Sequence, residues 1–91
     1  MDATETATIE ALEGFVRSYG QVAPDDPDFG RSTNLWEEGY LDSAGVVELL
    51  AFVEEHFGVT VPDEALFLPE FTTLDGMAEV VDRLLAGEPV V

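Results

Sequence analysis

The 91-residue chain has no cysteine and no lysine, and its basic side chains are three arginines and one histidine. Without cysteine it can form no disulfide, no thiolate metal site and no cysteine nucleophile, so any thiol chemistry needs an added group. Twenty Asp and Glu residues give a formal charge of −17 at pH 7. Such a chain repels nucleic acids and anionic membranes, because both are bound through Lys or Arg. We therefore expect a basic protein partner, and neither a nucleic-acid nor a membrane partner.

Long apolar runs are also lacking. No stretch approaches the roughly 20 residues of a membrane span. The N-terminal residues have neither the positive charge nor the apolar run of a signal peptide, so we expect a cytoplasmic protein. Hydrophobic residues still make up 46% of the chain, which argues for a folded core and against disorder. The length suits a single domain over 1–91.

Apolar residues recur at helical spacing in three long stretches. The β-branched residues of 59–64 have no second strand to pair with, so we interpret this segment as an extended connector. The sequence therefore predicts an all-α, four-helix bundle with three main helices, one short helix and a long first loop. The expected helices cover about 5–19 (opened by Thr4 or Thr6), 43–57, a short element at 65–71, and 73–86 (opened by Thr72 or Thr73).

The long connection between the first two helices contains several prolines and glycines. Loops of this length are uncommon in compact domains unless they are functional or anchored. Segment 35–38 is expected to form a helical turn capped by Ser32, Thr33 or Asn34. The side chains interpreted as core anchors of the loop are Phe29, Leu35, Trp36 and Tyr40.

The second helix begins at a carboxylate and a hydroxyl. Asp42 and Ser43 are both good N-cap residues, because a side-chain oxygen there can accept hydrogen bonds from unpaired backbone amides. Gly58 can take a positive φ and end the helix. Ser43 is thus predicted to present its hydroxyl at the mouth of a helix, next to an acid. By itself, this pattern is ordinary helix capping.

A catalytic triad is not supported. The single histidine, His56, lies on the same predicted helix as Ser43, almost four turns away at about 3.6 residues per turn, so the two side chains cannot meet. With twenty acids, close carboxylate pairs arise by chance and do not indicate a hydrolase. We expect no catalytic residue.

A calcium loop is equally weak. Asp26, Asp28 and Glu37 fall at the first, third and twelfth positions of an EF-hand. The fifth and sixth positions, which need an oxygen ligand and a glycine, are Gly30 and Arg31. We therefore expect no metal site.

Several blocks together resemble the acyl carrier and peptidyl carrier protein family. These blocks are LWEEGYLDS at 35–43, the apolar and acidic helix that follows, EEHFGVTVPDE at 54–64, and FTTL at 71–74. The resemblance implies a four-helix bundle. It also implies that a phosphopantetheinyl transferase moves phosphopantetheine from coenzyme A onto Ser43, with Asp42 as the adjacent acid. An acyl or aminoacyl group would then ride on the arm as a thioester, and the carrier itself would do no chemistry.

Extra apolar residues on the second helix have two readings. They widen the buried face, or they form a docking surface together with the acids beside them. The resemblance favours the second, although Ala44 stands where the family usually has a larger apolar residue. The residues expected to bind partners are Ala44, Val47, Glu48, Ala51 and Glu55.

The resemblance implies a free-standing, monomeric carrier of specialised metabolism of polyketide or nonribosomal peptide type, including antibiotic biosynthesis. Its expected partners are the transferase and an acyltransferase, adenylating ligase or synthase with a basic docking patch. The cargo could be an amino acid, a small acid or a polyketide unit, with a lean to an aminoacyl or other unusual unit. The alternative is an unmodified acidic helical interaction module in which Ser43 is only a cap.

Overall fold

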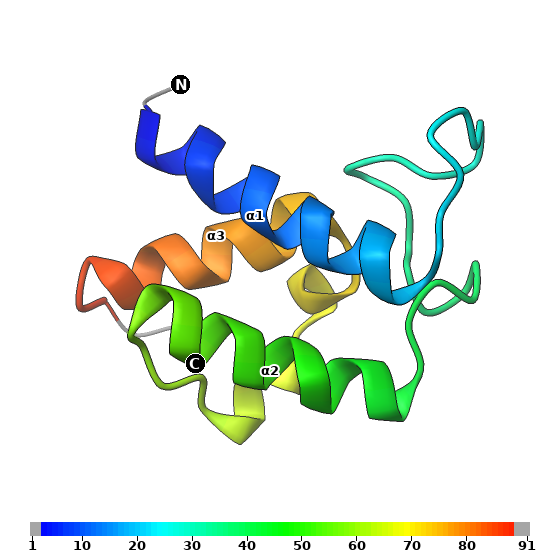
Figure 1. Ribbon diagram of the computed structural model, residues 1–91. Helices are drawn as coiled ribbons and strands as arrows, with labels where there is room; N and C mark the ends of the chain where they lie inside the picture. The colour runs from blue at the N-terminus through cyan, green and yellow to red at the C-terminus, as the bar shows by residue number, and fades with distance from the viewer. Residues whose placement is uncertain (1–2, 89–91) are drawn as a thin grey trace.

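The computed structural model describes residues 3–88, and within this range it is helical with no strand. The predicted all-α fold class is therefore confirmed. None of the helices in this range is long and apolar enough to cross a membrane. The helices are α1 (Ala3–Tyr19), α2 (Ser43–Phe57) and α3 (Leu74–Leu85), with the 3-10 helices η1 (Asp63–Phe67) and η2 (Pro69–Thr72) between α2 and α3 (Figure 1).

The helix starts differ in part from the expected ones. Helix α1 begins at Ala3, so Thr4 and Thr6 lie within it and not before its first residue. Thr73 is the N-cap of α3, where its hydroxyl oxygen accepts a hydrogen bond from the Gly76 amide at 3.0 Å. Thr72 does not share this role, because its hydroxyl donates to the Pro69 carbonyl at 2.7 Å.

The single short helix expected at 65–71 is instead two 3-10 helices. Leu68 separates them with an extended backbone, at φ −72° and ψ 139°. Pro69 follows it and opens η2. The residue before a proline is disfavoured in the helical region, because its backbone meets the proline ring, so the helix has to break there.

The core lies where α1 packs on α2 and α3. Val61 of the connector is buried in the core, and Val59 is half-buried against it. A buried polar contact joins α1 to α3, since the Thr8 hydroxyl donates to Asp82 at 2.7 Å. The largest fully buried side chains are Phe71, Leu12, Leu35, Leu49, Leu74 and Met77.

Three of the four expected anchors of the long connection contact the core. Phe29 and Leu35 are buried and Tyr40 is half-buried, whereas Trp36 is 39% exposed. The prediction for Trp36 was wrong, because Asn34 caps a helical turn here and accepts hydrogen bonds from the amides of residues 36 and 37. Successive side chains on a helical turn point about 100° apart, and on this turn the core side is occupied by Leu35 while Trp36 points toward solvent.

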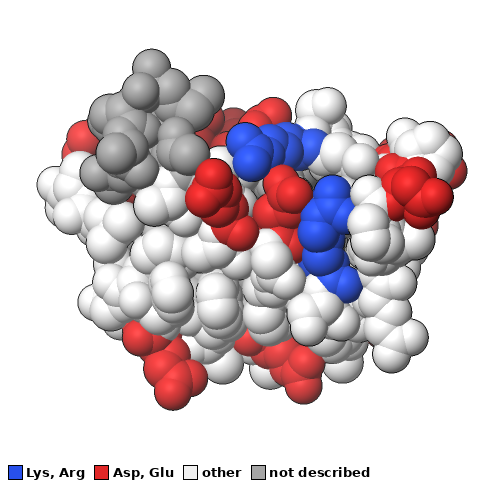
Figure 2. All heavy atoms as spheres, turned by 45° about the horizontal axis from the view of Figure 1, so that its top comes forward, with Lys and Arg blue, Asp and Glu red and all other residues white. Residues whose placement is uncertain are grey.

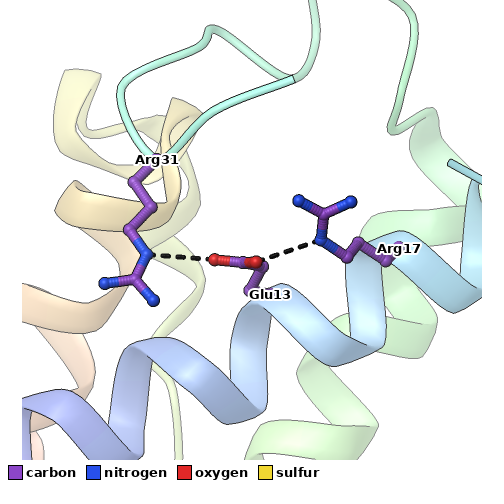
Figure 3. A network of polar contacts seen from close by, with 3 residues as sticks. All are labelled: Glu13, Arg17 and Arg31. Carbon is purple, nitrogen blue, oxygen red and sulfur yellow. Dashed lines mark hydrogen bonds and ion pairs between the residues drawn. The ribbon is translucent and has the colours of Figure 1, made fainter. Parts of the chain in front are cut away.

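The connection is also fastened to α1 by charge. Glu13 accepts a hydrogen bond from Arg17 on one carboxylate oxygen and from Arg31 on the other, both at 3.0 Å (Figure 3). These two hydrogen bonds lower the pKa of Glu13, and the hydrogen bond from Arg31 has the larger effect. The Arg17 guanidinium also lies over the Phe29 ring, 4.5 Å from its centroid. Figure 2 shows that basic side chains occupy a small part of this face, beside carboxylates.

Candidate functional site

The first turn of α2 places a serine at the edge of the bundle. The long connection leads from the end of α1 to the start of α2, and both of these points lie at the same end of the molecule (Figure 1). Asp42 is the N-cap, and its Oδ1 accepts a hydrogen bond from the Gly45 amide at 2.8 Å. Of the two capping candidates, the acid therefore caps and Ser43 is the first residue of the helix.

The Ser43 side chain is exposed, and no hydrogen bond to its hydroxyl is found within residues 3–88. A serine that caps its helix uses the hydroxyl oxygen to hold a backbone amide. Here the adjacent carboxylate does this instead, so the hydroxyl is left available to a reagent in solvent. The purely structural reading of Ser43 loses its main argument.

One contact at this site had no signal in the sequence. The Tyr19 hydroxyl, at the end of α1, donates a hydrogen bond to Asp42 Oδ1 at 2.9 Å. The hydrogen bond from the Gly45 amide, and then that from Tyr19, lower the pKa of Asp42. The same contact with Asp42 raises the pKa of Tyr19. At neutral pH the pair is thus an ionised carboxylate and a protonated phenol.

The exposed side of α2 begins next to Ser43. The buried residues of this helix are Gly45, Val46, Leu49 and Val53. The extra apolar positions therefore do not widen the buried face, and Val47 is 67% exposed. The five residues expected to bind partners, all of them exposed, are Ala44, Val47, Glu48, Ala51 and Glu55.

The other candidate sites do not assemble. His56 lies at the far end of α2 from Ser43 and stacks on Phe52, with ring centroids 5.0 Å apart. Asp26 uses one oxygen for the Asp28 amide and the other for the Tyr40 hydroxyl, both at 2.9 Å. Among the described residues, no group of three or more His, Cys, Asp or Glu side chains is arranged to hold a metal ion.

The described residues thus form a helical bundle that presents an exposed serine at a helix N-terminus, where a covalently attached group would be accessible. Residues 18–81 match the PP-binding family, described as the phosphopantetheine attachment site. The match covers more than two thirds of the sequence, and the chain belongs to this family. The resemblance seen in the sequence is confirmed, and phosphopantetheine is the covalent prosthetic group of the family.

Three curated relatives are D-alanyl carrier proteins. The chain is 40% identical over 50 residues to that of Bacillus velezensis, covering 55% of this chain and 64% of the relative. It is 46% identical over 41 residues to that of Bacillus licheniformis, covering 45% and 47%. It is 35% identical over 51 residues to that of Streptococcus mutans, covering 56% and 65%. Each match spans less than two thirds of the relative's length. The family to which the chain belongs is one of carriers and not of enzymes.

The residues at the start of α2 fit the phosphodiester of this prosthetic group. The first amides of a helix have no intrahelical partner, and the positive end of the helix dipole favours an anion. Asp42 takes the amide of Gly45, and within residues 3–88 no partner is found for the amides of Ser43 and Ala44. A phosphate on the Ser43 oxygen can accept from amides of this kind. The phosphopantetheine arm supplies the thiol that the chain itself lacks.

Proposed function

We propose that this chain carries an aminoacyl group as a thioester on phosphopantetheine attached to Ser43, and that it presents this group to biosynthetic enzymes. The observation that carries the proposal is the exposed hydroxyl of Ser43, for which no hydrogen bond is found among the described residues. The serine lies next to Asp42, which caps α2, and both are within the region that matches the family. In the attachment step, the Ser43 oxygen forms a phosphodiester with the phosphopantetheine phosphate of coenzyme A. The hydroxyl proton is lost and the nucleotide part of coenzyme A leaves.

The relatives support an aminoacyl cargo. All three are named D-alanyl carrier proteins, which favours an amino acid over a polyketide unit. We therefore expect an adenylating ligase to load the thiol with an amino acid. The name of the relatives gives no support for polyketide or nonribosomal peptide metabolism, and a polyketide unit delivered by an acyltransferase becomes an outcome for the test. Because the proposed cycle uses coenzyme A and a nucleotide, we expect it to run in the cytoplasm.

The exposed side of α2 is the proposed docking surface. Its small apolar side chains give an approaching enzyme close access to the helix next to Ser43, while Glu48 and Glu55 attract a basic patch. Opposite charge speeds encounter and orients it, and exposed ion pairs add little affinity. This combination suits a carrier, which has to leave each enzyme after a short visit. The arm then raises the effective concentration of the cargo at the active site.

Intact-mass measurement tests the attachment. The apo protein is incubated with coenzyme A, magnesium and a promiscuous phosphopantetheinyl transferase. We expect one phosphopantetheine increment, which Ser43→Ala abolishes without loss of the fold, because Asp42 still caps α2. Ser18→Ala is the matched control, since Ser18 is another exposed serine next to the site-forming Tyr19, and it retains the increment.

The outcomes separate the candidate functions. No mass gain in the unsubstituted chain, with a transferase active on a control carrier, makes the unmodified interaction module the better account. If the arm is attached, the holo protein is offered to an adenylating ligase with ATP and D-alanine. Loading by malonyl transfer from coenzyme A, in the absence of any aminoacyl loading, would replace the aminoacyl proposal with the polyketide one.

A further inference from the structure

We propose that Tyr19 is a positioning residue for the modification of Ser43: by holding the Asp42 carboxylate, it fixes the turn from which the serine hydroxyl projects. The inference rests on the proposed attachment at Ser43. It adds a residue of α1, 24 positions earlier in the chain, to a site that the sequence places entirely on 42–43. Tyr19 acts through Asp42 and does not itself contact the reacting atoms.

One oxygen atom joins the two helices. Asp42 Oδ1 receives the Tyr19 hydroxyl at 2.9 Å and the Gly45 amide at 2.8 Å. The last residue of α1 is thereby bonded to the first turn of α2 through the residue that precedes the serine. Within residues 3–88 no other residue donates a hydrogen bond to the second oxygen, Asp42 Oδ2, so the two donors on Oδ1 are the contacts that link the carboxylate to the two helices.

Gly45 allows this contact. A β-carbon on Gly45 would lie 2.6 Å from Tyr19 Cε1 and 2.9 Å from Cζ, well inside van der Waals contact. The phenol ring therefore lies directly against the backbone of the first turn of α2. A residue larger than glycine at position 45 would leave no room for the ring. The ring also stacks with Phe15, at 6.1 Å between centroids and 11° between planes. The ring thus has two packing contacts besides the hydrogen bond from its hydroxyl to Asp42.

Positioning at this point matters because Ser43 follows a long connection. Loops are in general more mobile than the helices that they connect, so a direct contact from Asp42 to α1 fixes the N-cap more firmly than the anchors of the connection alone would. Transfer requires the Ser43 oxygen to approach phosphorus in line with the leaving group, and a displacement of about 1 Å can lower such a rate roughly 10²-fold. The pKa of Asp42 is lowered and that of Tyr19 is raised, so both keep the protonation states that their hydrogen bond needs.

Tyr19→Phe tests the inference, because it deletes the hydroxyl and keeps the ring against Gly45. We expect kcat/KM for attachment by the transferase to fall about tenfold through kcat, with the KM for coenzyme A unchanged, because a loosened serine slows the chemical step. The melting temperature should change little. Tyr40→Phe is the matched control, since its hydroxyl also donates to an aspartate at 2.9 Å, but this acceptor is Asp26 of the long connection and not the N-cap of α2. It should leave kcat unchanged.

A double-mutant cycle provides a second test, because it measures whether Tyr19 acts through Asp42. In an Asp42→Ala background the shared oxygen is gone, so Tyr19→Phe should cause no further loss. Full kcat in Tyr19→Phe, an equal loss in Tyr40→Phe, or a further loss in the Asp42→Ala background would each overturn the inference. A loss that matches only the unfolded fraction, measured by circular dichroism, would also overturn it. Failure of the proposed function is distinguishable, because the unsubstituted chain would then gain no mass at all.

Discussion

Gly76, in the first turn of α3, lies directly against the backbone carbonyl of Glu70 in η2. A β-carbon on Gly76 would overlap that carbonyl oxygen and lie 2.8 Å from the Glu70 α-carbon. Both partners are backbone, and a backbone carbonyl cannot swing aside as the end of a side chain can. The close approach lets the 3-10 segment pack on α3 and leads the chain from the Leu68 break back into the core.

Gly76→Ala should therefore destabilise the protein by about 1–3 kcal/mol or more, the usual range for overpacking a well-packed site. Gly14→Ala is the matched control, because Gly14 lies within α1 and an added β-carbon would meet nothing within 4 Å. It should stabilise by about 0.5–1 kcal/mol, since alanine is the better helix former. Urea unfolding of both variants measures the difference. Equal free energies of unfolding would show that η2 can move away from α3 at little cost.

The two sides of α2 should respond differently to truncation. Leu49 is fully buried, so Leu49→Ala should cost about 2–5 kcal/mol of unfolding free energy. Val47 is 67% exposed, so Val47→Ala should change stability by less than about 0.5 kcal/mol. Chemical denaturation of the apo protein checks both. A larger loss in the Val47 variant would mean that the proposed docking surface is part of the core.

Helical periodicity was sufficient for the fold class and for α2, since repeating apolar positions mark which side of a helix is buried. Local rules were weaker where several residues competed for one role. Trp36 was expected in the core but is exposed, whereas Leu35, its neighbour on the same turn, is buried. Thr72 and Thr73 both suited a cap, and only Thr73 has its oxygen at the Gly76 amide.

The site likewise has one part that could be predicted from local sequence and one part that could not. A carboxylate and a serine before an apolar helix could be read locally, because capping involves residues close in sequence. The hydrogen bond from Tyr19 to Asp42 could not, because it joins residues 23 positions apart and depends on how α1 packs on α2. Periodicity can assign a tyrosine to one face of a helix, but it cannot identify the acceptor of its hydroxyl.

The ion pairs of Glu13 should make the anchoring of the long connection sensitive to acid. Because its folded-state pKa is lowered from the ordinary 4.5, Glu13 contributes stability that is present above this value and is lost as pH falls through the lowered folded-state pKa. Glu13→Gln should lower the melting temperature at pH 7, and the difference from the unsubstituted protein should shrink as pH falls below about 4.5. Differential scanning calorimetry across this range measures it.

Glu10→Gln serves as the control for Glu13→Gln. Glu10 is exposed on the same helix and has no ion pair among the described residues. Its replacement removes the same negative charge from a chain at −17, which relieves the general repulsion without touching the arginines. A melting-temperature difference that is equal in the two variants at every pH would assign the effect to net charge and not to the Glu13 ion pairs.

Charge reversal on α2 tests the proposed docking surface. Glu48→Lys places a positive charge on the exposed side of α2, in the turn that follows the one carrying Ser43. If a basic patch docks there, the KM for the carrier should rise roughly fivefold at low salt, and its dependence on ionic strength should flatten. Steady-state kinetics of phosphopantetheine attachment at several salt concentrations measures both.

Glu10→Lys makes the same change in net charge on α1, where no docking is proposed. Charges separated by more than about 10 Å are largely screened near 0.1 M salt, so the effects of the two variants should diverge as salt rises toward that value. At very low salt, both should slow the encounter through the overall field of the molecule. If the two KM values stay equal at every ionic strength, the transferase responds to the total charge of the carrier, and the exposed side of α2 does not direct its docking.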